Sequence, residues 1–366
     1  MKESISKCQE PPSCYVTDSS CNTIAYILPE LFKRTSNPRS NSGSNTNTNS
    51  TNQQIQFAGV KNLKILSSNS ISLSWSQATS TASNSSEIEY LVYSSNTSNG
   101  QNFNIPLQVT PKGATSITIS SLTANTNFYF VVRARDTSGI MDTNTNQRAA
   151  LLNGLIRYIP LDSSSLSTME KIGNQSITAQ GTPLLSTTDR LGVVNNAFTL
   201  NGSSQYFEFN QNLPQVLPTG NAAKTFCAWI RTTNTANQTI VSYGLTSAQQ
   251  SVFMLTQFSG YSYLSYVQPS SFQSDGTIGT FLSNGVWQFV CITNQSLGAN
   301  TLTGFQINSN FSQLIRFFAT NSSNGVLGRI GVLSYSLNDY FNGSISEVSI
   351  WDRALTPEEL LEVYKN

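Results

Sequence analysis

Residues 287–293 read WQFVCIT, and the fold of this chain is decided by this stretch and its counterpart earlier in the sequence. Its aromatic and β-branched residues predict a buried β-strand, but Cys291 lies in the middle of it. The counterpart is TFCAWI at residues 225–230, which has the same pattern around Cys227. Each of these two strands therefore carries a single thiol among apolar residues.

Charged side chains are scarce in this chain. They make up 11% of the 366 residues, against roughly 25% in an average globular domain, and the formal net charge is +1. No basic or acidic block is present, so we expect neither nucleic-acid binding nor electrostatic docking on a membrane. Ser, Thr and Asn supply the polarity, a composition typical of secreted and surface proteins built from strands and turns.

The chain contains no histidine. This removes Ser-His nucleophile pairs, imidazole general bases and His-ligated zinc from the candidate chemistries. No apolar run reaches the length of a membrane-spanning helix, so no transmembrane helix is expected. The first ten residues, MKESISKCQE, lack the apolar stretch of a secretory signal.

The N-terminal part divides into a cysteine-containing segment, residues 1–34, and an Asn/Ser/Thr-rich tether, residues 35–56. The tether has too few apolar side chains to offset its ordering entropy, so we expect it to be disordered. If Cys14 pairs with Cys21, then Cys8 is left over. A lipid anchor near Cys8, followed by a tether, is typical of bacterial surface lipoproteins, although this anchor needs a longer precursor.

Residues 57–150 consist of short alternating strands separated by polar turns, which is the pattern of a β-sandwich. In ISLSW, at residues 71–75, the alternation places Ile71, Leu73 and Trp75 on one face. Further strands are expected at residues 90–93, 116–119 and 128–134.

Several motifs of this region resemble a fibronectin type III domain. They are the strand that ends at Trp75, the Tyr-x-Val pattern at Tyr90 and Val92, and the turn LTANTNF that leads into a strand ending Val-x-Ala. The resemblance implies a seven-stranded sandwich. It also implies that Phe128 replaces the corner tyrosine of the family, with the loss of one hydrogen bond worth about 1 kcal/mol. No Arg-Gly-Asp tripeptide is present, and we expect this domain to act as a spacer.

A second β pattern fills residues 151–366. Thr356 is the expected N-cap of a short C-terminal helix, with Pro357 at its first position and Glu359 completing a capping box. AFTLNGSSQYFEF reads as two strands joined in a hairpin by an Asn-Gly turn. The expected strands lie within residues 155–162, 197–209, 224–230, 287–293 and 341–351.

This second region resembles a laminin G-like domain of the concanavalin A-like jelly-roll superfamily. The matching motifs, in the order of that family, are Tyr-x-Pro-x-Asp at 158–162, TTDRLG at 187–192, the AFTLNGSSQY segment, the Ala-Trp strand, and the Gly-x-Ile-x-Glu-Val-x-Ile-Trp ending. The resemblance implies an all-β protein in which a larger jelly-roll sandwich with a short C-terminal helix follows the first domain.

The resemblance also addresses the two thiols. Pentraxins, which share this jelly roll, carry a disulfide between the corresponding strands, which implies a bond between Cys227 and Cys291. The alternative is a pair of buried free thiols. Since such a disulfide persists only in an oxidising compartment, it predicts that the protein is extracellular or on the cell surface.

Catalysis is not expected. Glycoside hydrolases of this superfamily place two carboxylates at alternate strand positions. Here only Glu87 and Glu89 have that spacing, and they fall in the first sandwich rather than the jelly roll.

Calcium is a candidate cofactor by resemblance, because many laminin G-like domains hold this ion. Asp162 matches the opening-strand ligand, and Glu347 matches one acid of the later motif. Ser346 stands where the family has a second acid, so the ligand set is smaller than the six to eight oxygens that calcium takes.

Four tyrosines are the candidate ligand contacts: Tyr261, Tyr263, Tyr335 and Tyr340. All tryptophans are used by scaffold motifs, and we expect Phe, Val, Ile and Trp on the inward faces of the strands. Simple cross-strand packing is the alternative role for the tyrosines. The sequence favours a non-enzymatic surface protein that recognises glycans or matrix and surface proteins; the alternative is a structural component of a cell envelope or virus-like particle.

Overall fold

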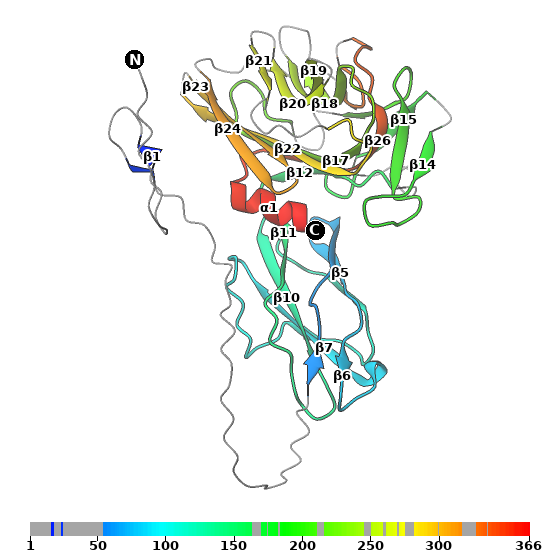
Figure 1. The fold of residues 1–366 in the computed structure, drawn as a ribbon, viewed down its shortest axis with the longest axis vertical. Coiled ribbons are helices and arrows are strands. Elements are labelled where there is room, and N and C mark those ends of the chain that lie inside the picture. The colour runs from blue at the N-terminus through cyan, green and yellow to red at the C-terminus, as the bar shows by residue number, and fades with distance from the viewer. Residues whose placement is uncertain are drawn as a thin grey trace, which may run out of the picture. The chain divides into compact units, whose positions relative to one another are not determined.

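The computed structural model in Figure 1 divides the chain into two compact units, Met1–Thr51 and Asn52–Asn366. In the first unit, β1 (Val16–Thr17) pairs with β2 (Thr23–Ile24), while Cys8 and the predicted tether up to residue 53 lie outside the described residues. The structure describes residues 16–17, 23–24, 54–162, 170–173, 175–181, 184–210, 216–244, 250–258, 261–268, 271–274, 282–298, 300–316, 327–334 and 336–366.

The N-terminal sandwich comprises two sheets of three and four strands, which confirms the seven strands expected. An additional short pair joins β3 (Ile55–Gln56) to β6 (Thr79–Ser80), so the last two residues predicted as tether belong to the fold. The first sheet has the order β4 (Asn62–Ser67), β5 (Ser70–Ser74) and β9 (Ser116–Ile119). The second has the order β11 (Gln147–Leu151), β10 (Asn127–Arg135), β7 (Glu89–Ser95) and β8 (Gln108–Val109), and a 3-10 turn η1 (Ser85–Glu87) precedes β7.

Alternation along β5 determines the core of this sandwich. Ile71 and Leu73 are fully buried and Trp75 nearly so, as the period-two pattern predicts. The Trp75 indole N–H donates to the carbonyl of Ala114 at 3.0 Å, and the buried hydroxyl of Tyr90 accepts from the N–H of Ala78 at 2.9 Å. The polar atoms of both large side chains therefore remain satisfied inside the core.

In its described residues, the C-terminal sandwich consists of an eight-stranded and a seven-stranded sheet. In the first, the order is β14 (Leu185–Thr187), β15 (Ala197–Asn201), β26 (Asn342–Trp351), β17 (Lys224–Arg231), β22 (Gln288–Leu297), β23 (Asn300–Ile307) and β24 (Asn310–Arg316), with β12 (Leu155–Ile159) also paired to β26. The seven-stranded sheet has the strand order β13 (Ile177–Gln180), β16 (Tyr206–Asn210), β25 (Leu327–Ile330), β18 (Gln238–Gly244), β19 (Gln250–Phe258), β20 (Tyr261–Gln268) and β21 (Ser271–Ser274).

The predicted hairpin at the Asn-Gly turn is wrong. β15 lies in the eight-stranded sheet and β16 in the seven-stranded one, so the turn crosses from one layer to the other. Its geometry comes from the Asn201 side chain, whose oxygen accepts from the N–H groups of Ser203, Ser204 and Gln205 at 3.0 to 3.2 Å. These bonds hold a wide corner instead of the tight two-residue turn.

The central strands of the eight-stranded sheet are apolar on both faces. Phe226, Ala228 and Ile230 face the interior of the sandwich, where they join its main core. Cys227 and Trp229 point to the opposite face and belong to a different apolar cluster. In the C-terminal sandwich, the expectation that tryptophans face inward is therefore wrong: both faces of these strands are apolar, and Trp229 and Trp351 lie on the outer one.

The disulfide between Cys227 and Cys291 is present, and both residues are fully buried. The two cysteines are direct register partners on β17 and β22, with their Cα atoms 4.2 Å apart. The bond lies on the outer face of the sheet, among the side chains that the helix covers, and not in the interior of the sandwich.

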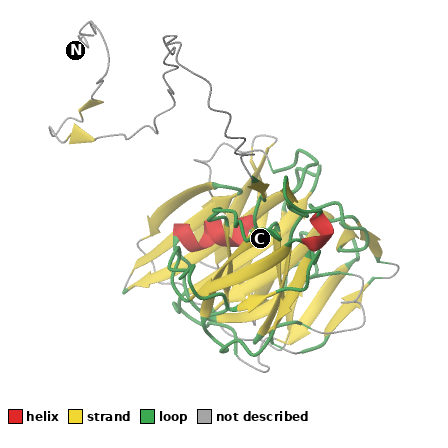
Figure 2. Ribbon diagram, turned by 90° about the horizontal axis from the view of Figure 1, so that it is seen from below, coloured by secondary structure: helices red, strands yellow, loops and turns green. Residues whose placement is uncertain are grey.

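The helix α1 (Pro357–Lys365) lies across this outer face (Figures 1 and 2). Thr356 caps it, and the predicted capping box with Glu359 is present. The ring of Tyr364 stacks on Trp229, with centroids 5.7 Å apart. The indole of Trp351 donates to the carbonyl of Leu151 in β11, at 3.0 Å.

Peptide mapping of the intact protein under non-reducing conditions tests the disulfide. We expect one species in which the peptide with Cys227 is linked to the peptide with Cys291, and reduction should release the two peptides, whose summed mass exceeds that of the linked species by about 2 Da. Replacing both cysteines by Ala should lower the free energy of unfolding by roughly 4 kcal/mol, since the bond closes a long loop. Complete alkylation of both residues without reduction would contradict the structure.

Glu359 connects the helix start to the N-terminal sandwich. It accepts two hydrogen bonds from Arg353 at 2.7 Å and one from Asn127 at 3.3 Å. Burial by itself would raise the pKa of Glu359, but these bonds and the N–H of Thr356 together lower its pKa below the ordinary value of 4.5. Because this pKa is lower in the folded protein than in the unfolded chain, the ionised carboxylate stabilises the fold fully above the ordinary pKa of 4.5. This stabilisation is lost as the pH falls through the folded-state pKa.

We therefore expect Glu359→Ala to reduce the free energy of unfolding by about 2 kcal/mol at neutral pH. The matched control is Glu358→Ala in the same helical turn, where the exposed side chain should matter by less than about 0.5 kcal/mol. Urea titrations from neutral pH down to acid conditions measure both effects. Equal stabilities of the two variants, or an unchanged acid response in Glu359→Ala, would contradict this role.

Candidate functional site

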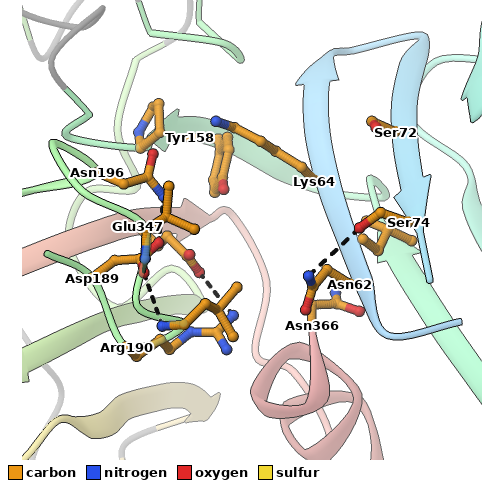
Figure 3. Close-up of a pocket in the computed structure, with 14 residues that line it drawn as sticks. Asn62, Lys64, Ser72, Ser74, Tyr158, Asp189, Arg190, Asn196, Glu347 and Asn366 are labelled. Atoms are coloured by element: carbon orange, nitrogen blue, oxygen red, sulfur yellow. Dashed lines mark hydrogen bonds and ion pairs between the residues drawn. The ribbon is translucent and has the colours of Figure 1, made fainter. Parts of the chain in front are cut away.

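A pocket of about 250 Å³ lies between the two sandwiches. Figure 3 shows side chains of β4 and β5 on one side of it, and those of the 189–196 loop and β26 on the other. The N-terminal sandwich contributes Asn62, Lys64, Ser72 and Ser74. Its role as a spacer stays a prediction.

Asp189 shapes the loop that forms one wall of the pocket. One of its carboxylate oxygens accepts from the N–H groups of Leu191 and Val193, at 2.8 and 2.9 Å, and the other accepts from the amide of Asn196. These bonds hold the loop in one conformation and present Leu191 and Val193 at the rim of the pocket. The segment TTDRLG, which the sequence identified only as a family motif, therefore supplies part of the site.

Arg190 and Glu347 form the charged side of the pocket. Their closest atoms are 3.5 Å apart, and the guanidinium of Arg190 lies over the ring of Trp229 at 4.4 Å from its centroid. Glu347 has a positive φ of 53° and its N–H donates to the carbonyl of Pro160 at 3.0 Å. This bulged backbone directs the carboxylate toward the pocket instead of along the regular alternation.

Asp162 lies near Tyr158 and pairs with Lys64 of the N-terminal sandwich at 3.3 Å. Burial raises the pKa of the Tyr158 phenol well above its usual value, and the negative charge of Glu347 adds to this. Tyr158 therefore remains protonated, and its hydroxyl can both donate and accept hydrogen bonds.

The two predicted calcium ligands thus lie around the same tyrosine, but each carboxylate has a cationic partner: Lys64 for Asp162 and Arg190 for Glu347. Among the described residues, no group of three or more His, Cys, Asp or Glu side chains could hold a metal ion. Calcium binding by Asp162 and Glu347 stays a prediction.

The predicted tyrosines do not line this pocket in the described part of the chain. Tyr263 is half-buried on β20, with Thr256 of β19 as its register partner, and it lies on the strand face opposite the core residues Leu264 and Tyr266. Tyr340 packs edge-on against Tyr206, with centroids 6.1 Å apart. Tyr335 and the side chain of Tyr261 lie outside the described residues. Ligand contact by these four tyrosines stays a prediction.

Glu87 and Glu89, the carboxylates considered for catalysis, lie in the N-terminal sandwich and do not line the pocket. Glu89 pairs with Arg135 at 2.7 Å, and Glu87 ends the turn η1 of the N-terminal sandwich.

Sequence reasoning missed Asn62, Lys64 and Arg190 as site residues. Only Arg190 lay in a motif that the sequence analysis identified, TTDRLG. The contacts of Asn62 and Lys64 depend on how the two sandwiches pack against each other.

Two family models match the chain. A fibronectin type III model matches residues 58–148, and a model described as the concanavalin A-like lectin/glucanases superfamily matches residues 201–361. The chain contains a fibronectin type III domain followed by a laminin G-like domain. The structure extends the laminin G-like domain to strands before residue 201, because β12 and β15 pair with β26.

Solved structures similar to this chain include domain 4 of AbnA, an extracellular GH43 arabinanase from Geobacillus stearothermophilus, in complex with arabinotriose. It is 18% identical, with a TM-score of 0.42, over 57% of this chain and 98% of that one. The binding domain of botulinum neurotoxin serotype D is 15% identical, with a TM-score of 0.42, over 58% of this chain and 50% of that one. This chain thus spans about half of the neurotoxin domain that it matches. No curated protein matches the chain.

Fibronectin type III and laminin G-like domains are extracellular-type domains that typically serve as binding modules. In the part of the chain that the structure describes, no helix is long and apolar enough to cross a membrane.

Arg190 provides a test of the wall of the pocket. Arg190→Lys keeps the charge that faces Glu347 but loses the planar contact with Trp229, so we expect a loss of about 1 kcal/mol in the free energy of unfolding. Arg190→Ala should cost more, since it leaves Glu347 without this partner. Denaturant titrations measure both variants, and a Lys variant as stable as the wild type would show that the ring contact contributes nothing.

Proposed function

We propose that this protein is a non-enzymatic extracellular or cell-surface binding protein that recognises glycans through the pocket between its two domains. The observation that carries the proposal is the composition of the pocket wall: amides and hydroxyls from both domains surround the ring of Tyr158. Amides, hydroxyls and an aromatic ring match the hydroxyl groups and apolar ring faces of a sugar. A pocket of this size fits a terminal saccharide better than a folded protein surface.

Uncharged groups dominate the side that the fibronectin type III domain supplies. Asn62, Ser72 and Ser74 project from the outer face of β4 and β5, while Ile71 and Leu73 fill the core beneath them. The charged groups of the lining already have partners: Lys64 and Arg190 are in ion pairs, and Asp189 accepts hydrogen bonds within its own loop. A neutral ligand thus meets these groups without leaving a charge unpaired.

A glycan array with the full chain tests the proposal. We expect specific glycans to bind the wild type, and Ser72→Tyr should weaken that binding at least about tenfold because the new ring fills the pocket. Ser70→Tyr is the matched control: it adds the same side chain on the same face of the same strand, outside the lining residues. Equal binding by both variants would place the ligand elsewhere.

Two alternative functions give different results in the same set of measurements. Binding to immobilised matrix proteins without binding to any glycan would favour a protein ligand. Concentration-dependent assembly in light scattering, with neither kind of ligand bound, would favour the structural role in an envelope or particle. Either result would contradict glycan recognition at this pocket.

We also propose that Asp162 and Glu347 bind calcium, on the resemblance of their positions to those of the family. Calcium would then tie the segment after β12 to β26 beside the pocket. Chelation with EDTA should lower the melting temperature of the wild type and leave that of Asp162→Asn unchanged, because that variant lacks one charged ligand. An identical response of the two proteins to EDTA and added calcium would rule the site out.

A further inference from the structure

A second hollow lies on the outer face of the eight-stranded sheet, at the other end of α1. We name it the outer-sheet hollow; it has a volume of about 410 Å³ and is formed by β22, β23 and β24 together with residues 353–357. Pro357, the first residue of α1, lines it, whereas Asn366, which follows the helix, lines the interdomain pocket. The two cavities are therefore separate sites.

Gly304 creates this hollow. It occupies the middle of the cross-strand row Thr293–Gly304–Gln313, so the row has no side chain at its centre. A Cβ atom at Gly304 would lie 2.7 Å from Cζ of Phe311 and 2.5 Å from Oγ1 of Thr293, both too close for real contacts. Only glycine therefore lets the tip of the Phe311 ring lie over the backbone of β23.

The floor and rim differ in polarity. The half-buried ring of Phe311 and the side chain of Leu302 supply apolar surface, whereas the side chains of Gln295 and Gln313 are exposed at the rim. In the described part of the chain, these two amides make no hydrogen bond to other side chains or to the backbone. Each can therefore donate and accept for a ligand.

The hollow is electrically neutral. Arg353 is the one charged residue among those described in its lining, and both of its terminal nitrogens donate to Glu359 at 2.7 Å. Thr356 and Glu359 already cap the N-terminus of α1, so no free N–H cluster attracts an anion there. The chemistry thus fits a neutral ligand that combines an apolar face with hydroxyl groups.

We propose that the outer-sheet hollow binds a neutral saccharide, with one sugar ring stacked on Phe311 and its hydroxyls bonded by Gln295 and Gln313. The volume lies within the roughly 300–1,000 Å³ of small-molecule sites, which leaves room for more than one sugar unit. This site extends glycan recognition beyond the interdomain pocket, and it does not require that pocket to bind.

Saturation-transfer NMR on the full chain tests the site with a panel of neutral trisaccharides in gluco, manno, galacto, xylo and arabino configurations. Phe311→Leu keeps the apolar volume but removes the ring, and should weaken binding at least about fivefold. Gln313→Ala should weaken it about threefold through the lost hydrogen bonds. Ile315→Ala is the control, since it is exposed on the same strand and face but does not line the hollow.

The expected result is binding that falls in Phe311→Leu and Gln313→Ala and is unchanged in Ile315→Ala and in Ser72→Tyr. Thermal melts of each variant establish that it is folded. Binding that is lost in Ser72→Tyr alone would support the interdomain pocket and overturn the outer-sheet hollow. The hollow is equally overturned if no trisaccharide of the panel binds, or if Phe311→Leu and Gln313→Ala both bind like the wild type.

Discussion

The burial of one apolar sheet face determines the organisation of the C-terminal half of this protein. On the outer side of β17, β22 and β26, the disulfide, Trp229, Phe289 and Trp351 form a surface as apolar as the interior of a sandwich. Leaving it in water would cost roughly 25 cal/mol for each Å² exposed. The laminin G-like domain therefore needs a cover, and the cover is made from α1 together with β11 of the fibronectin type III domain.

This requirement also explains why the two domains share hydrogen bonds as well as an apolar cluster. Trp351 donates to the backbone of β11, and the side-chain amide of Asn366 donates to the carbonyl of Ala149 at 2.7 Å. The short connection between the sandwiches is held by Asn125 and Asn127, which accept from the N–H groups of Gly154 and Asn153 at 2.8 and 3.0 Å. The cover leaves a cavity at each end of α1, and these are the two cavities to which we assign ligands.

Period-two patterns and capping sequences predicted strands of both sandwiches and the capping box at Thr356, since these depend on local sequence. The seven-stranded sandwich came from the family resemblance, and the Asn-Gly hairpin was wrong because the chain crosses there between sheets. The face of the tryptophans could not be predicted, because both faces of β17 are apolar and alternation alone does not say which one is inside. The pocket was equally hidden from the sequence. Lys64 meets Asp162 across 98 residues, and only the packing of the two domains brings them together.

The scarcity of charge has a consequence for the ligand recognition that we propose. Amide groups such as those of Asn125 and Asn127 fix the junction between the domains, and amides and hydroxyls supply uncharged polar groups to the lining of both cavities. Salt screens interactions between exposed charges but has little effect on neutral hydrogen bonds and on apolar contacts. Arg353, the charged residue of the outer-sheet hollow, is already neutralised by Glu359. Recognition of the proposed ligands would depend on shape and hydrogen-bond geometry, which a scaffold held by a disulfide and a buried sheet face keeps constant.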